Sequence, residues 1–143
     1  AQRLLRVDQM TGRLDTLEPF GAPGGGIIAP PVNVPEFDIA IAWDSINGGL
    51  AGISTAGQLE PVWHLDVKPS MQPVVFPESG ELVINDFTVD QTDDLIVVDI
   101  ETGQLLSRVA TGSRLANGMF LTAGDNRDVY YCSTLSWARV AWV

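Results

Sequence analysis

The fold is decided by the stretch Leu95-Ile96-Val97-Val98-Asp99-Ile100-Glu101-Thr102-Gly103-Gln104-Leu105. A short aliphatic run rich in β-branched residues leads into a polar turn that ends in glycine, and a second run follows it. Gly103 supplies the positive φ of a tight hairpin turn without steric cost. The stretch therefore predicts two antiparallel strands joined by a tight turn.

The same pattern occurs in two other parts of the chain, at residues 4–14 and 50–59. The turn glycines Gly12, Gly57 and Gly103 lie 45 and 46 residues apart (57 − 12 and 103 − 57). A period near 45 with several short strands in each repeat is typical of β-propeller blades. The sequence therefore predicts an all-β fold of four-stranded antiparallel blades.

Each repeat divides into short runs of Val, Ile, Leu and aromatic residues, bounded by Gly, Pro, Asn and Asp. The expected strands are 27–32, 37–43, 50–53 and 58–65, then 73–76, 81–86, 95–100 and 104–110, and finally 118–122, 128–133 and 138–143. The resulting organisation is one propeller segment of about three blades' worth: a half blade at 1–20, blades at 21–66 and 67–112, and a partial blade at 113–143.

Three blades are fewer than the four to eight of closed propellers, so the sequence leaves open what covers the end blades. Bare blade faces expose apolar surface, and unpaired edge strands invite association. Two expectations follow, namely that the remaining blades belong to a longer propeller, or that further copies of this chain close a ring. An isolated three-blade monomer is the least favoured arrangement.

The composition of the 143 residues is globular, with 45 % hydrophobic and 18 % charged residues. Eighteen acidic against eight basic residues give a net charge of −10, which disfavours nucleic acids and anionic membranes as partners. The apolar runs are too short for membrane insertion. One cysteine excludes an internal disulfide, and the compartment stays open between cytoplasmic and mature secreted.

Alternate connections of a four-stranded meander lie at the same end of its strands. The links from the second to the third strand therefore share one face of the propeller with the links between blades. Such loops, held by a rigid scaffold, are where binding residues gather. The candidate ligand-binding residues on this face are Asp44, Asn47, Asp86, Asp90, Arg114 and Asn117.

An acidic run also lies on this face, formed by Asp86, Asp90, Asp93 and Asp94. Carboxylate oxygens are ligands for hard cations. The run lacks the spacing of a calcium loop, so a solvated loop is the favoured interpretation.

His64 and Cys132 have weaker functional interpretations. A single histidine cannot form a multi-histidine metal site, so we expect His64 to be packed or on the surface. Cys132 lies within a strand run without an identifiable base, which favours a buried, inert thiol. The four tryptophans occur in strand contexts and are expected in the core or between blades: Trp43, Trp63, Trp137 and Trp142.

Residues 115–122 (Leu-Ala-Asn-Gly-Met-Phe-Leu-Thr), 128–131 (Asp-Val-Tyr-Tyr) and 138–140 (Ala-Arg-Val) resemble a blade of the gluconolactonase and strictosidine-synthase-like propellers. In those families an Asn-Gly pair opens the inner strand, and a Tyr-rich second strand follows. The resemblance implies that Asn117 faces a bound divalent cation, such as calcium, zinc or manganese. The position where these families often carry Asp is occupied here by Cys132 and Ser133.

The earlier repeats are similar to quinoprotein propellers of the pyrroloquinoline-quinone-dehydrogenase or YVTN type. The similarity is carried by an Asp-x-x-Thr-Gly turn, present at residues 8–12 and 99–103. Because propellers of many functions share this turn, it indicates the fold and not the reaction.

Three functions follow, the first being a propeller scaffold or binding module without chemistry of its own. It depends on the clear repeat and on the lack of a Ser-His-Asp constellation around the one histidine. The alternative is a metal-dependent lactone or ester hydrolase, in which a cation at Asn117 polarises a carbonyl and a carboxylate positions water. Asp44, Asp86 or Asp90 would add oxygen ligands. A quinone-binding dehydrogenase segment is least favoured, because cofactor-clamping residues are not recognisable.

Overall fold

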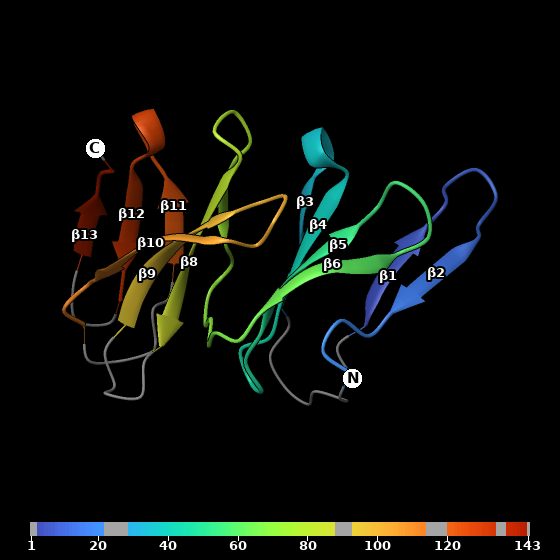
Figure 1. The fold of residues 1–143 in the computed structure, drawn as a ribbon, viewed down its shortest axis with the longest axis horizontal. Helices are drawn as coiled ribbons and strands as arrows, with labels where there is room; N and C mark the ends of the chain where they lie inside the picture. Colours follow the sequence, from blue (N-terminus) through green and yellow to red (C-terminus); the bar gives the residue numbers. More distant parts are fainter. Residues whose placement is uncertain (1–2, 22–28, 88–92, 114–119, 134–136, 143) are drawn as a thin grey trace.

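The computed structural model describes residues 3–21, 29–87, 93–113, 120–133 and 137–142, which form β-strands and loops (Figure 1). Helical structure in these ranges consists of two short 3-10 turns, η1 (Pro35–Phe37) and η2 (Asp125–Arg127). Neither turn, and no other helix in the described ranges, has the length and apolar character needed to cross a membrane. The prediction of an all-β fold is confirmed.

The strands form four antiparallel sheets, and in each sheet they follow one another in chain order. The first sheet contains β1 (Leu4–Val7) and β2 (Leu14–Leu17). The second contains β3 (Val32–Val34), β4 (Ile39–Trp43), β5 (Leu50–Ser54) and β6 (Glu60–Leu65). The third contains β7 (Val74–Phe76), β8 (Glu81–Phe87), β9 (Asp93–Asp99) and β10 (Leu105–Ala110). The fourth contains β11 (Phe120–Ala123), β12 (Val129–Cys132) and β13 (Trp137–Val140).

Most strands lie within a few residues of their expected positions, and the largest difference is at β3. This strand was expected at 27–32 and is observed at Val32–Val34. Pro30 and Pro31 have no backbone N–H for the ladder, which explains why the pairing starts only after them. Parts of the expected strands 27–32, 118–122 and 138–143 lie outside the described residues.

The hairpin turns at Gly12 and Gly103 have the same geometry, with φ of 72° and 71°. In each turn the aspartate four residues earlier accepts the glycine N–H through its backbone carbonyl, at 2.8 and 2.9 Å. The expectation of the same conformation at Gly57 is wrong, since its φ is not positive. That loop has no such aspartate, and the Arg6 guanidinium instead donates to the carbonyls of Thr55 and Gly57.

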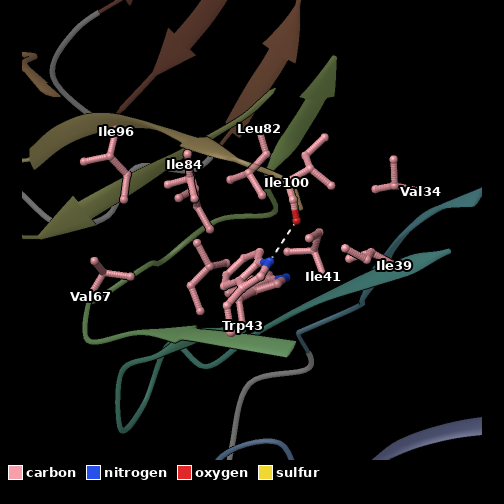
Figure 2. Packing of buried hydrophobic residues seen from close by; sticks show 12 residues of the cluster. Val34, Ile39, Ile41, Trp43, Val67, Leu82, Ile84, Ile96 and Ile100 are labelled. Carbon is pink, nitrogen blue, oxygen red and sulfur yellow. Dashed lines mark hydrogen bonds between the residues drawn. The ribbon is translucent and has the colours of Figure 1, made fainter. Parts of the chain in front are cut away.

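The sheets are stacked face to face, and the apolar core lies between them (Figures 1 and 2). Alternation along β9 shows how one strand serves two interfaces. Ile96 and Val98 pack against the second sheet, whereas Leu95 and Val97 pack against the fourth. The third sheet is therefore covered on both faces.

Two tryptophans confirm the expectation of a core position. Trp43 is buried and donates its indole N–H to the Pro30 carbonyl at 2.9 Å. Trp63 lies between the second and third sheets, where Figure 2 draws its cluster, and donates to the Ile100 carbonyl at 2.8 Å. Trp142 is partly buried against the apolar cluster between the third and fourth sheets. The expectation is wrong for Trp137, which is 82 % exposed because no described sheet covers its side of the fourth sheet.

Candidate functional site

The carboxylates of the acidic run lie at one end of the third sheet. Asp86 lies next to the last residue of β8, and Asp93 and Asp94 are the first two residues of β9. All three are buried, so the expectation of a solvated loop is wrong for them. The strand pairing continues to Phe87 and Asp93, which draws these residues into the ladder. Asp90 lies outside the described residues.

Arg108 on β10 bridges two of these carboxylates. Its Nη1 lies 3.0 Å from an oxygen of Asp94, and its Nη2 lies 2.6 Å from an oxygen of Asp86. The second oxygen of Asp86 accepts the backbone N–H of Lys68 at 2.8 Å. These carboxylate oxygens are therefore committed to donors from the chain itself.

Asp93 is fully buried between the third and fourth sheets. Its carboxylate accepts a hydrogen bond from Asn85 Nδ2 at 2.8 Å and another from the Tyr131 hydroxyl at 2.7 Å. Burial raises the pKa of the Asp93 carboxyl above its usual value of 3.8, although both hydrogen bonds oppose that shift. Because Tyr131 lies on β12, this contact joins two sheets.

The amide of Asn85 extends this network to the link between the second and third sheets. Its oxygen accepts the backbone N–H of Ser70 at 2.9 Å, and its Nδ2 donates to the Ser70 hydroxyl at 2.8 Å. On the other side, Ser113 and Ser133 are in contact through their hydroxyls at 3.2 Å. The network thus fixes the links on both sides of the third sheet.

Asp44 and Asn47 are brought together in the loop between β4 and β5. The buried Asp44 carboxylate accepts the backbone N–H groups of Ile46 and Asn47 at 2.8 and 3.0 Å. Asn47 Nδ2 donates to its second oxygen at 3.2 Å. Both candidate residues therefore shape their own loop, an Asx-type arrangement.

The remaining candidates, Arg114 and Asn117, lie outside the described residues. Within the described ranges, no group of three or more His, Cys, Asp or Glu side chains is placed to hold a metal ion. His64 is exposed on β6, as expected. Its ring lies edge-on to the ring of Phe20, with the two ring centroids 5.8 Å apart. Cys132 is half-buried, since it lies on the outer side of the fourth sheet and not in the core.

A hollow of about 530 Å³ lies at the opposite ends of the strands. It is lined by residues 75–79, around the β7–β8 turn, and by residues 124–127, before β12. An ion pair of 2.5 Å between Arg127 and Glu81 joins the two walls. The hollow therefore lies at the ends of the strands opposite the loops on which the sequence places the candidate ligand-binding residues.

The sequence predicted bare apolar end faces without identifying their residues, and one such face is the outer side of the fourth sheet. We call it the forward face, and it carries Phe120, Tyr130, Cys132 and Trp137. Phe120, Cys132 and Trp137 are register partners in one row across the three strands. Phe120 is 64 % exposed and Trp137 is 82 % exposed, so the described part presents an uncovered aromatic surface here.

The outer face of the first sheet, which we call the backward face, is apolar as well. Leu5 and Val7 on β1 are 57 % and 58 % exposed, and Leu14 on β2 is register partner of Val7. Their neighbours Leu4 and Leu17 point the other way and pack against the second sheet. Both ends of the stack therefore expose apolar side chains.

The strand registers show which buried positions correspond to these exposed ones. The pair Cys132–Trp137 occupies the register position of Trp43–Leu50 in the second sheet and Asn85–Leu95 in the third. Leu50 and Leu95 are completely buried there, because a further sheet covers them.

The same comparison holds at the other end. In the aligned stretches, Leu5 and Val7 correspond to Ile96 and Val98, which are completely buried against the second sheet. The described residues thus form an all-β stack of antiparallel sheets with an open apolar face at each end. No protein-family model matches the chain, and the search of curated proteins finds no match.

Proposed function

We propose that the chain is a β-propeller-type scaffold segment. In this proposal the stacked sheets hold the connecting loops in place, and both end faces dock onto further sheets of the same repeat. The observation that carries it is the exposure of Trp137 at a register position where Leu50 and Leu95 are buried. Covering a large apolar side chain stabilises by about 1.5–3 kcal/mol, which gives docking a driving force.

The polar residues on the loop side support a structural role. Asp86 and Asp94 are paired with Arg108, and Asp93 is bonded to Asn85 and Tyr131. These contacts tie neighbouring strands and sheets together, which a scaffold needs. The hydrolase alternative depends on Asn117, outside the described residues, and no contact of the described residues favours it.

Acrylamide quenching of single-tryptophan variants tests the proposal. One variant keeps Trp63 and another keeps Trp137, with the other tryptophans replaced by Phe. At concentrations where the chain is a single copy, a stacked scaffold protects Trp63, whose indole lies between two sheets, and leaves Trp137 open to the quencher. Equal quenching of the two indoles in folded protein would contradict stacked sheets.

A further inference from the structure

The two open faces differ in the kind of side chain they carry. The forward face of the fourth sheet is aromatic, with Phe120, Tyr130 and Trp137, whereas the backward face of the first sheet is aliphatic, with Leu5, Val7 and Leu14. Arg139, which shares the forward face, is paired with Asp128 of its own sheet. Neither row therefore presents an unpaired charge.

The same combination already forms an interface inside the chain. Between the second and third sheets, Trp43 and Trp63 pack against an aliphatic surface that includes Ile96 and Val98. Leu5 and Val7 occupy the corresponding positions of the first sheet. An aromatic forward face on an aliphatic backward face is thus an arrangement that this fold uses.

We infer that the forward face of one copy packs on the backward face of a second copy, head to tail. This inference rests on the proposed function and names a second copy as the sheet that covers each end. The contact joins two different surfaces, so it is heterologous, and every copy contributes one forward and one backward face to it. Association of the chain in solution therefore continues until the copies close into a ring, or without limit where the rotation between copies does not close.

Two variants, each blocked at one face, test this contact by sedimentation velocity. The forward-face variant carries Phe120→Ser and Trp137→Ser, and the backward-face variant carries Leu5→Ser and Leu14→Ser. Val62→Ser is the matched control, because Val62 is 53 % exposed on β6 and belongs to neither face. Circular dichroism confirms that each variant is folded.

Head-to-tail packing predicts that the mass of the unmodified chain and of the control grows with concentration. Each blocked variant alone stays at the mass of one chain, and an equimolar mixture forms particles of twice that mass. Self-association of the backward-face variant alone would overturn the inference in favour of forward-to-forward pairing. A single-chain mass for the unmodified protein at every concentration would also overturn it, whereas only the quenching of Trp63 bears on the scaffold itself.

Discussion

Trp63 on β6 donates its indole N–H to the carbonyl of Ile100, 2.8 Å away, in the next sheet along the stack. The two residues are separated by 37 positions in the chain, with Trp63 in the second sheet and Ile100 directly after β9 of the third. The bond adds a directional contact to an interface that is otherwise apolar, and it satisfies a buried carbonyl.

Replacing Trp63 with Phe keeps most of the apolar contact and removes the donor. The Ile100 carbonyl then loses its partner in the core, so we expect the free energy of unfolding to fall by about 1–3 kcal/mol. Urea denaturation measures this difference. Val62→Ala, one residue away and exposed, should stay within about 0.5 kcal/mol of the unmodified protein. Equal effects of the two substitutions would argue against the inter-sheet bond.

Two glycines in equivalent turns, Gly12 and Gly103, allow the cost of a steric clash between neighbouring sheets to be measured separately from the cost of backbone strain. Gly12 and Gly103 have nearly the same positive φ, so Ala at either position costs about 1–2 kcal/mol of backbone strain. A Cβ at Gly12 has no neighbour within 4 Å, whereas one at Gly103 would lie 2.6 Å from the Trp63 ring. We expect Gly103→Ala to be more destabilising than Gly12→Ala by about 1–3 kcal/mol in thermal or urea unfolding.

The buried Asp93 carboxyl makes stability depend on pH. Its folded-state pKa is raised above 3.8 by burial, so the folded protein binds the proton more tightly than the unfolded chain. Stability therefore falls as the pH rises from 3.8 through the folded-state pKa, and it does not recover above that value. Asp93→Asn removes this titration. The unfolding free energy of the variant minus that of the unmodified protein should therefore increase between pH 3 and pH 7.

The hydroxyl of Tyr131 provides the control for this pH dependence. It donates to Asp93, and this bond favours the ionised carboxylate. Tyr131→Phe should therefore raise the folded-state pKa of Asp93 further and steepen the loss of stability with pH. A pH profile of urea midpoints that is identical in all three proteins would contradict this role of Asp93.

The strands and their antiparallel pairing in chain order were the part of the fold that the sequence predicted best. Aliphatic runs such as Leu95–Val98 and the turn at Gly103 depend on local sequence, so their strands were expected close to where they lie. The burial of Asp93 could not be predicted in this way. It depends on Asn85 and Tyr131, which come from another strand and another sheet.

The exposure of Trp137 was missed for a related reason. An aromatic residue in a strand is normally expected in the core, and only its register partners reveal that no described sheet covers it. Asp44 and Asn47 were correctly placed in one loop, but as partners of each other and not as free ligands. Residue type alone did not distinguish a carboxylate that binds a ligand from one that shapes its loop.

Divalent cations distinguish the scaffold from the hydrolase. The carboxylates of Asp86 and Asp94 are bonded to Arg108, and the described residues hold no cluster placed to bind a metal ion, so a scaffold should show no change of melting temperature with millimolar calcium, zinc or manganese. A metal site would raise the melting temperature by mass action. A rise that is abolished by Asn117→Ala, accompanied by lactonase activity, would instead support the hydrolase.

Amide hydrogen exchange on single copies tests the stack of sheets most directly. The β1–β2 and β9–β10 hairpins share the same turn, but β9 is covered by sheets on both faces, whereas β1 is covered on one. We predict that the amides of β8 and β9 exchange most slowly and that those of β1 and β2 exchange much faster. Equal protection of the two hairpins would contradict the account.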